Sequence, residues 1–225
     1  MKLFISFIFL CIITLVIEMN YEILVNKDNP IDINYYDNVV KPSLVEIDYF
    51  RENDDVFDEI GISSKKIYLE ENAGKYFLLL RTFLKKKGII FDIVSGFLSL
   101  EEQQKKYDSY LKRNGIEKTK MKMCLPLYSE HNTGLAVDCD FYKNGTWGEI
   151  CNEENESEIN YIHSIIHNFG FVLRYPKDKE RITNMEYEPW HIRFVGKKLA
   201  KELYDNNLTL EEYYEKKMRN NMRNK

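Results

Sequence analysis

The chain has 225 residues, with 32 Lys and Arg against 36 Asp and Glu, and a formal net charge of −4. Its 44% hydrophobic and 30% charged residues are ordinary for a globular protein and exclude a wholly disordered chain. The lack of a basic excess argues against a nucleic-acid-binding protein, because such proteins neutralise phosphates with Lys and Arg. A chain of this length forms one domain with a sizeable core.

The first residues are typical of a segment that directs export across a membrane. Lys2 precedes a run of uncharged, mostly apolar residues from Leu3 to Ile17, and Glu18 follows it. The run has the length of a signal peptide and is shorter than the roughly 20 residues of a comfortable membrane span. Because no pair of small residues marks a cleavage site, residues 1–20 are predicted to be a signal peptide or an uncleaved anchor. The rest of the protein is then expected at the extracytoplasmic face of the cell membrane, anchored or secreted.

Residues 21–205 are predicted to form one domain, and residues 206–225 a C-terminal helix with a basic tail. The part from 21 to 64 is acidic and rich in Asn, Asp and Tyr, which favours an irregular lead-in. Hydrophobic periodicity and turn residues then predict, in chain order, a helix (67–87), a strand (89–94), a helix (99–115), a strand (135–141), a helix (157–169), two strands (171–175 and 190–195) and two helices (197–204 and from 209). Since strands and helices do not alternate regularly, we expect an α+β fold with helices packed on a small antiparallel sheet.

Two of the predicted helices begin with a capping box, in which a hydroxyl side chain and a glutamate three residues later cap each other's backbone. The boxes are Ser99-Leu100-Glu101-Glu102 and Thr209-Leu210-Glu211-Glu212. Cysteine usage adds little, since the three cysteines beyond the leader allow at most one disulfide and contain no Cys-x-x-Cys pair. The sequence does not decide the pairing among Cys124, Cys139 and Cys151.

Two of the four histidines lie where a metal site could form. His131 is in a loop that leads into the predicted strand carrying Asp138, and His191 follows a proline at the start of another strand. Two imidazoles and one carboxylate suit a zinc ion that keeps a fourth position for water. Glu188, three residues before His191, could act as the base that takes a proton from that water. On spacing alone, two unconnected histidines with local structural roles are an equally good interpretation.

The motifs around these residues resemble a known family. They read Ser129-x-His131-x-x-Gly134-x-Ala136-x-Asp138 and, further on, Glu188-Pro189-Trp190-His191. Three more segments agree in order, namely Val25 to Pro30, Ser95-Gly96-Phe97 and Phe171 to Pro176. Over about residues 22–200 the chain is similar to the VanY-type zinc D-alanyl-D-alanine carboxypeptidases, relatives of the VanX dipeptidases and of L-alanyl-D-glutamate endopeptidases.

The resemblance implies a zinc metallopeptidase, with one zinc per chain, that removes the terminal D-alanine from peptidoglycan stem peptides. It implies three zinc ligands: His131, Asp138 and His191. Glu188 would be the general base, and Ser129 and Gln103 match positions that line the substrate site. The motifs do not distinguish a carboxypeptidase from an endopeptidase that cuts inside the stem peptide, so the endopeptidase stays an alternative.

One position departs from the family pattern. The family usually reads Ser-Gly-Tyr-Arg-Ser where this chain has Leu98 in place of the arginine. By the resemblance, that arginine lies near the scissile carbonyl, and loss of one oxyanion donor typically costs about a hundred- to a thousandfold in rate. Another cation, Arg174 or Lys122, could replace it, or the substrate could differ. The third alternative is a weakly active or non-catalytic protein that binds the cell wall, which the presence of Glu188 and of all three ligands opposes.

Overall fold

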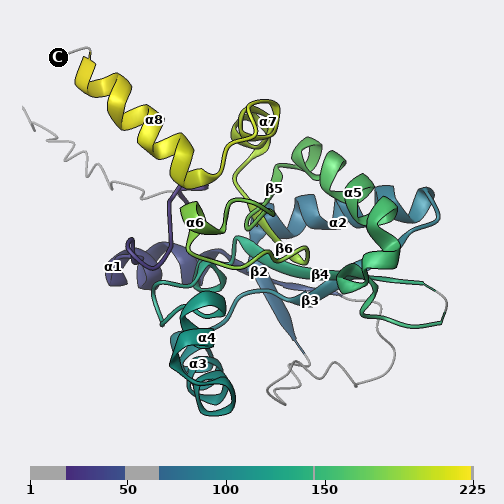
Figure 1. The fold of residues 1–225 in the computed structure, drawn as a ribbon, viewed down its shortest axis with the longest axis horizontal. Coiled ribbons are helices and arrows are strands. Elements are labelled where there is room, and N and C mark those ends of the chain that lie inside the picture. Colours follow the sequence, from purple (N-terminus) through teal and green to yellow (C-terminus); the bar gives the residue numbers. More distant parts are fainter. Residues whose placement is uncertain (1–18, 49–65, 144, 224–225) are drawn as a thin grey trace, which may run out of the picture.

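The computed structural model describes residues 19–48, 66–143 and 145–223 (Figure 1). The apolar run of the predicted signal peptide or anchor therefore lies outside the described residues. Among the residues that are described, no helix is long and apolar enough to cross a membrane. Cys124 and Cys139 are free and buried, and no disulfide joins two cysteines of the residues that the structure describes.

A four-stranded antiparallel sheet lies at the centre of the fold, with the strand order β3-β4-β6-β5. Its strands are β3 (Ile90–Ser95), β4 (Ala136–Tyr142), β5 (Phe171–Leu173) and β6 (His191–Phe194). A second, two-stranded sheet pairs β1 (Leu44–Ile47) with β2 (Ile67–Glu70). All pairings are antiparallel, which confirms the predicted α+β class.

Helices surround the sheet. They are α1 (Ile33–Tyr35), α2 (Glu71–Lys86), α3 (Leu100–Asn114), α4 (Ile116–Lys122), α5 (Glu156–Ile165), α6 (Glu180–Thr183), α7 (Lys197–Asp205) and α8 (Leu210–Arg223). Shorter turns are a π-helix (Tyr36–Val40) and the 3₁₀ segments Lys41–Ser43, Glu130–Thr133, Glu149–Cys151, Glu153–Asn155 and Ile166–Phe169. In Figure 1, α3 and α4 lie together on the side away from α2 and α5, and α8 projects from the body.

The main core lies between the sheet and two helices. From α2 it takes Phe77 and Leu80, from α5 Ile162, and from β4 Val137 and Cys139, all of which are at most 1% exposed. Val137 and Cys139 alternate along β4 with Asp138, as the sequence predicts. One face of the strand therefore packs into the core, while Asp138 lies on the other face, towards α3.

The predicted helix over 67–87 is wrong at its first turn. Residues Ile67–Glu70 instead form β2, with alternate residues Ile67 and Leu69 buried against the core. The side chain of Glu70 then accepts a hydrogen bond from the backbone N–H of Ala73 and caps α2. The cause is tertiary, because β2 finds its partner β1 in the lead-in. That lead-in is irregular only in part, since it contains α1, two short helical turns and β1.

Candidate zinc-binding active site

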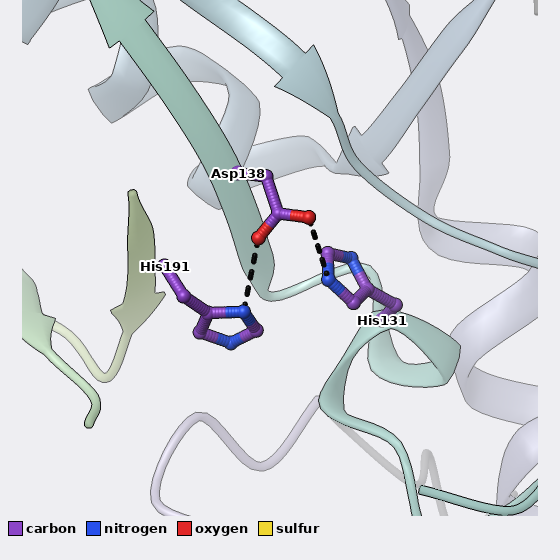
Figure 2. A group of neighbouring side chains, drawn as sticks. All are labelled: His131, Asp138 and His191. Carbon is purple, nitrogen blue, oxygen red and sulfur yellow. Dashed lines mark ion pairs between the residues drawn. The ribbon is translucent and has the colours of Figure 1, made fainter. Parts of the chain in front are cut away.

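The structure brings together three predicted ligands from three separate elements (Figure 2). His131 lies in the 3₁₀ turn before β4, Asp138 lies on β4, and His191 begins β6. Asp138 and His191 are direct partners in the β4–β6 register. One ligand atom from each of the three residues lies within 4.8 Å of the others. The interpretation of two unconnected histidines is therefore wrong.

Gly134 fixes the loop that carries His131. Its φ is +70°, in the left-handed region that favours glycine, and a Cβ there would lie 2.7 Å from Leu44 Cδ2 and 3.0 Å from the backbone nitrogen of Glu70. The Gly134 carbonyl accepts a hydrogen bond from Glu70 N at 2.9 Å. Any side chain at 134 would push the loop away from the β1–β2 sheet and move His131 with it.

The two imidazoles present different nitrogens to Asp138. His131 Nδ1 donates to the carbonyl of Gly96 at 2.7 Å, so Nε2 is the nitrogen turned towards Asp138 Oδ2, 3.2 Å away. His191 faces the other way, with Nε2 3.6 Å from Glu130 Oε2 and Nδ1 3.0 Å from Asp138 Oδ1. A carbonyl or carboxylate on the outer nitrogen is the usual arrangement of a metal-binding histidine, because it orients the ring. Both rings thus turn a ligand nitrogen towards the same point.

A buried polar atom without a partner marks the same place. Asp138 Oδ1 lies on the side of the ligand nitrogens, is buried and has no hydrogen-bond partner within normal geometry, whereas His191 Nε2 and Glu130 Oε2 face each other 3.6 Å apart on the outer side. Such an atom is rare in folded proteins and calls for an explanation. Two imidazole nitrogens and a carboxylate oxygen form a donor set that Zn²⁺ prefers, with a fourth position left for water. The residues present therefore fit a zinc ion.

The charges agree with a cation at this point. Burial alone would raise the pKa of Asp138, but the imidazoles of His131 and His191 hold that pKa well below its usual range. Burial would lower the pKa of His191, yet the carboxylates of Asp138 and Glu130 outweigh it and raise the pKa to about 9. In the metal-free protein a protonated imidazole thus supplies the positive charge that the carboxylates require.

Glu188 lies beside the predicted ligands. Its Oε2 is 3.7 Å from His191 Nδ1, and the side chain is buried. Burial raises the pKa of Glu188 to about 7, and the nearby Asp138 adds to the rise, while His191 and two lysines oppose it. A carboxylate with a near-neutral pKa is suited to accept and return a proton at physiological pH.

The turn that carries Glu188 is held from several sides. Glu188 N donates to the carbonyl of Tyr175 at 3.1 Å, and His191 N donates to the carbonyl of Glu188 at 3.2 Å. His163 Nε2 on α5 donates to the carbonyl of Pro189 at 2.9 Å. The histidine at 163 therefore supports the turn from the far side of the sheet, a positioning contact that the sequence does not reveal.

A cavity of about 370 Å³ opens in front of these residues. His131, Asp138, Glu188 and His191 line it, together with Ser129, Gln103 and parts of α3 and α4. Gln103 Nε2 donates to the carbonyl of Cys124 at 2.7 Å, and its Oε1 is buried without a partner. Both residues predicted to contact substrate thus line the cavity.

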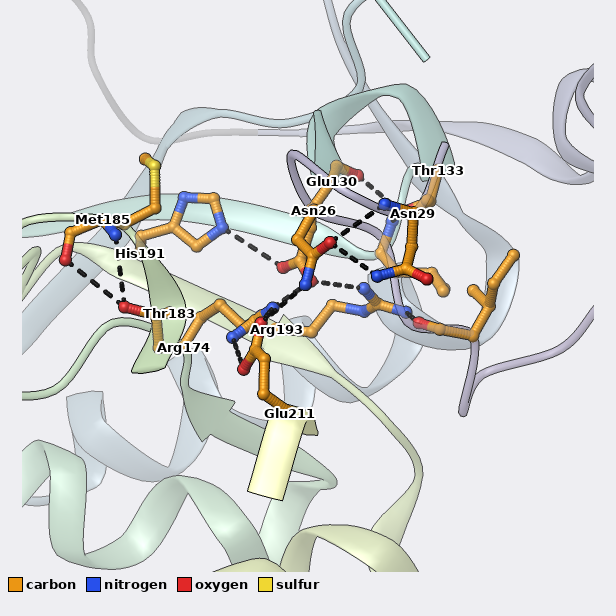
Figure 3. A network of polar contacts seen from close by, with 12 residues as sticks. Asn26, Asn29, Glu130, Thr133, Arg174, Thr183, Met185, His191, Arg193 and Glu211 are labelled. Carbon is orange, nitrogen blue, oxygen red and sulfur yellow. Dashed lines mark hydrogen bonds and ion pairs between the residues drawn. The ribbon is translucent and has the colours of Figure 1, made fainter. Parts of the chain in front are cut away.

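Behind the candidate ligands lies a buried charge network (Figure 3). Glu130 Oε1 accepts from Arg174 Nε at 2.7 Å and from Arg193 Nη1 at 2.8 Å, and all three side chains are at most 1% exposed. Burial favours the neutral acid, but the two guanidinium groups outweigh it and hold the pKa of Glu130 far below its usual range. Glu130 therefore remains ionised next to His191.

The network reaches both ends of the described chain. Arg174 donates two hydrogen bonds to Glu211 on α8, at 2.9 and 2.6 Å. Arg193 Nη2 donates to the carbonyls of Tyr21 and Ile23 at 3.3 and 2.9 Å. Sequence analysis missed this network; its one sequence signal is a charged residue, Arg193, between the apolar Ile192 and Phe194 of β6.

The structure also answers which cation can replace the family arginine. Arg174, one of the two candidates, is enclosed in the buried network and does not line the cavity, so that expectation is wrong. The other candidate, Lys122, does line it. Leu98 acts through its backbone: its N–H donates to the carbonyl of His131 at 3.1 Å, and its carbonyl accepts from Asn132 Nδ2 at 2.7 Å. Its side chain is not part of the cavity wall.

The family model for VanY, described as D-alanyl-D-alanine carboxypeptidase, matches residues 66–197, which is more than half of the chain. The chain belongs to the VanY family. It is 40% identical over 157 residues to YodJ of Bacillus subtilis (strain 168), which is provisionally named a carboxypeptidase. That match covers 68% of this chain and 55% of YodJ, so the chain spans about half the length of this relative.

Two solved structures are similar in fold to this chain. The LD-carboxypeptidase LdcB is 34% identical with a TM-score of 0.68, over 85% of this chain and 84% of that one. A VanY D,D-pentapeptidase from a VanB-type resistance cassette, solved with Zn(II), is 26% identical with a TM-score of 0.66, over 87% of this chain and 99% of that one. These likenesses confirm the predicted family and the α+β fold.

Proposed function

We propose that this VanY-family protein is a zinc-dependent carboxypeptidase that removes the terminal D-alanine from peptidoglycan stem peptides. The observation that carries the proposal is the convergence of His131, Asp138, His191 and Glu188 on one cavity. At about 370 Å³ the cavity has the size of a small-ligand site and accommodates the end of a peptide. The description of the matching family and the zinc in its solved member support the substrate and the metal.

Different residues of the site bind the metal, transfer the proton and contact the substrate. Bound zinc would polarise the scissile carbonyl and bring the pKa of a bound water towards neutrality. Glu188 Oε2 accepts the proton of the attacking water and returns it to the nitrogen of the leaving D-alanine, as its near-neutral pKa allows. Asp138 and the two histidines hold the metal, and Gly96 and Glu130 orient the imidazole rings. Ser129 and Gln103 contact the substrate from the cavity wall.

The test is release of D-alanine from a peptide ending in L-Lys-D-Ala-D-Ala by zinc-loaded protein. Glu188→Gln is expected to bind zinc and to lose at least about a hundredfold in kcat, the usual contribution of a general base. Glu186→Gln is the matched control, because Glu186 is half-exposed and lies two residues away, and it should be mild. If Glu186→Gln were the inactive variant, the base would have to be reassigned to Glu186.

The likeness to LdcB favours one second candidate, cleavage at a bond between an L- and a D-residue. A stem tetrapeptide ending in L-Lys-D-Ala separates the two activities, because it has no D-Ala-D-Ala bond. Faster D-alanine release from this tetrapeptide than from the pentapeptide would assign the LD activity. Cleavage that leaves the terminal D-alanine in place would assign the endopeptidase alternative.

We further propose that residues 1–20 deliver the domain, residues 21–205, to the extracytoplasmic face of the membrane, where peptidoglycan is assembled. The apolar run from Leu3 to Ile17 supports this, as does the family. Residues 206–225 then form the C-terminal extension, which contains α8.

A further inference from the structure

Two lysines bring positive charge into the active-site cavity. Gln103, Lys106 and Tyr110 of α3 line its wall, and their spacing of three and four residues places them on one face of the helix. Lys122, the last residue of α4, lines the cavity as well. Apart from the candidate ligands, no other cationic side chain of the described residues belongs to that wall.

The two lysines differ in what they already bind. Lys122 Nζ lies 3.3 Å from Glu186 Oε2 and 5.8 Å from the centre of the Trp190 ring. Lys106 has no carboxylate within ion-pair distance in the part of the chain that the structure describes. Its neighbour Lys105, on the exposed side of α3, pairs with Glu101 at 2.7 Å. A partly buried lysine that faces a cavity and lacks a counter-charge is available to bind an anion from outside the protein.

The position of Lys106 relative to the reaction centre is also informative. Lys106 and Glu188 line the same cavity. A carboxypeptidase substrate ends one residue beyond the scissile bond, and one residue spans only about 3.8 Å. Its terminal carboxylate therefore lies in the same cavity as Glu188. There it needs a cation, because an unpaired buried carboxylate is costly.

We propose that Lys106 binds the C-terminal carboxylate of the substrate and so makes the enzyme a carboxypeptidase. The assignment rests on the proposed function and names the residue that decides which peptide end fits. A lysine suits this task because its ammonium offers three donors on a flexible stem.

The test compares two peptides, one ending in D-Ala-D-Ala with a free carboxylate and the same peptide with a C-terminal amide. Lys106→Met in the full-length zinc-loaded protein should raise KM for the free acid by about ten- to a hundredfold, the usual effect of losing a charge-assisted hydrogen bond. On the amide its KM should match that of the unaltered protein. Lys106→Arg should restore most of the preference for the acid. Lys105→Met, the matched control, should leave KM for both peptides unchanged.

An equal loss on both peptides would assign Lys106 a structural role and overturn the proposal, as would an unchanged KM for the acid. A binding measurement tests the role of Lys106 independently of catalysis. Calorimetry of the two peptides with Glu188→Gln protein, with and without Lys106→Met, measures recognition of the carboxylate without turnover. If the protein cleaved neither peptide but still preferred the acid through Lys106, the proposed function would fail, while the assignment of Lys106 to the carboxylate would stand.

Discussion

Asp138 lies between His131 and His191, and each ring presents a different nitrogen to it, Nε2 in one case and Nδ1 in the other. Residue types and order alone did not decide between a metal site and two unconnected histidines, and the resemblance to the VanY-type family implied these three residues as the ligands. The choice of nitrogen could not be predicted. It depends on contacts with Gly96 and Glu130 that only the folded chain provides.

The pKa of His191 makes zinc binding depend on pH. Burial opposes the charged imidazole, but Asp138 and Glu130 raise its pKa to about 9, so the metal-free protein carries this proton at pH 7. A zinc ligand must be neutral, so binding at pH 7 should release about one proton from His191. Below pH 9 the affinity should fall as the pH falls, by up to about tenfold per pH unit for one competing proton.

Calorimetric zinc titrations in buffers of different ionisation enthalpy measure this proton. Glu188→Gln is the control, because the pKa of Glu188 is raised to about 7 and its proton could also leave. The released proton should persist in that variant. Binding at pH 7 with no proton release would contradict the assignment to His191.

At the scale of elements, α8 is connected to the site through buried charge. Glu211 accepts two hydrogen bonds from Arg174, which also donates to Glu130, and Glu130 faces His191. Glu211→Gln removes one of the two carboxylates that pair with the buried guanidinium of Arg174. We expect it to lower the free energy of unfolding of the metal-free protein by about 3 kcal/mol.

Glu215→Gln is the matched control on the same helix, since Glu215 pairs with Arg219 on the exposed surface, where an ion pair contributes less than about 1 kcal/mol. Urea unfolding followed by circular dichroism measures both variants. Equal midpoints would show that α8 does not stabilise the domain through Arg174.

Local signals predicted some elements well and others poorly. Both capping boxes are present: Ser99 and Glu102 bond each other's backbone N–H at the start of α3, and Thr209 and Glu212 do so at the start of α8. Such contacts span three residues, so the sequence contains them in full. The strand β2 was predicted as helix. Its partner β1 is about 20 residues away in sequence, and local hydrophobic periodicity contains no information about such a distant pairing.

At the scale of the whole molecule, the chain leaves almost no linker between the leader and the domain. The apolar run ends at Ile17, and Tyr21 and Ile23 already accept hydrogen bonds from Arg193 behind the candidate zinc site. An uncleaved leader would therefore hold the active site close to the membrane surface. We expect peptides containing Met1 and Lys2 in the membrane fraction, with the domain accessible to protease added outside the cell. A soluble protein whose N-terminus lies near residue 20 would instead show that the leader is cleaved.

The central claim is that His131, Asp138 and His191 together hold one zinc ion. Metal analysis of the purified full-length protein tests it most directly, with His131→Ala and His191→Ala beside His167→Ala, whose ring stacks on Tyr204 away from the site. We predict about one equivalent of zinc in the unaltered protein and in His167→Ala, and a sharp loss in the other two variants. A full equivalent retained by both His131→Ala and His191→Ala would contradict the account.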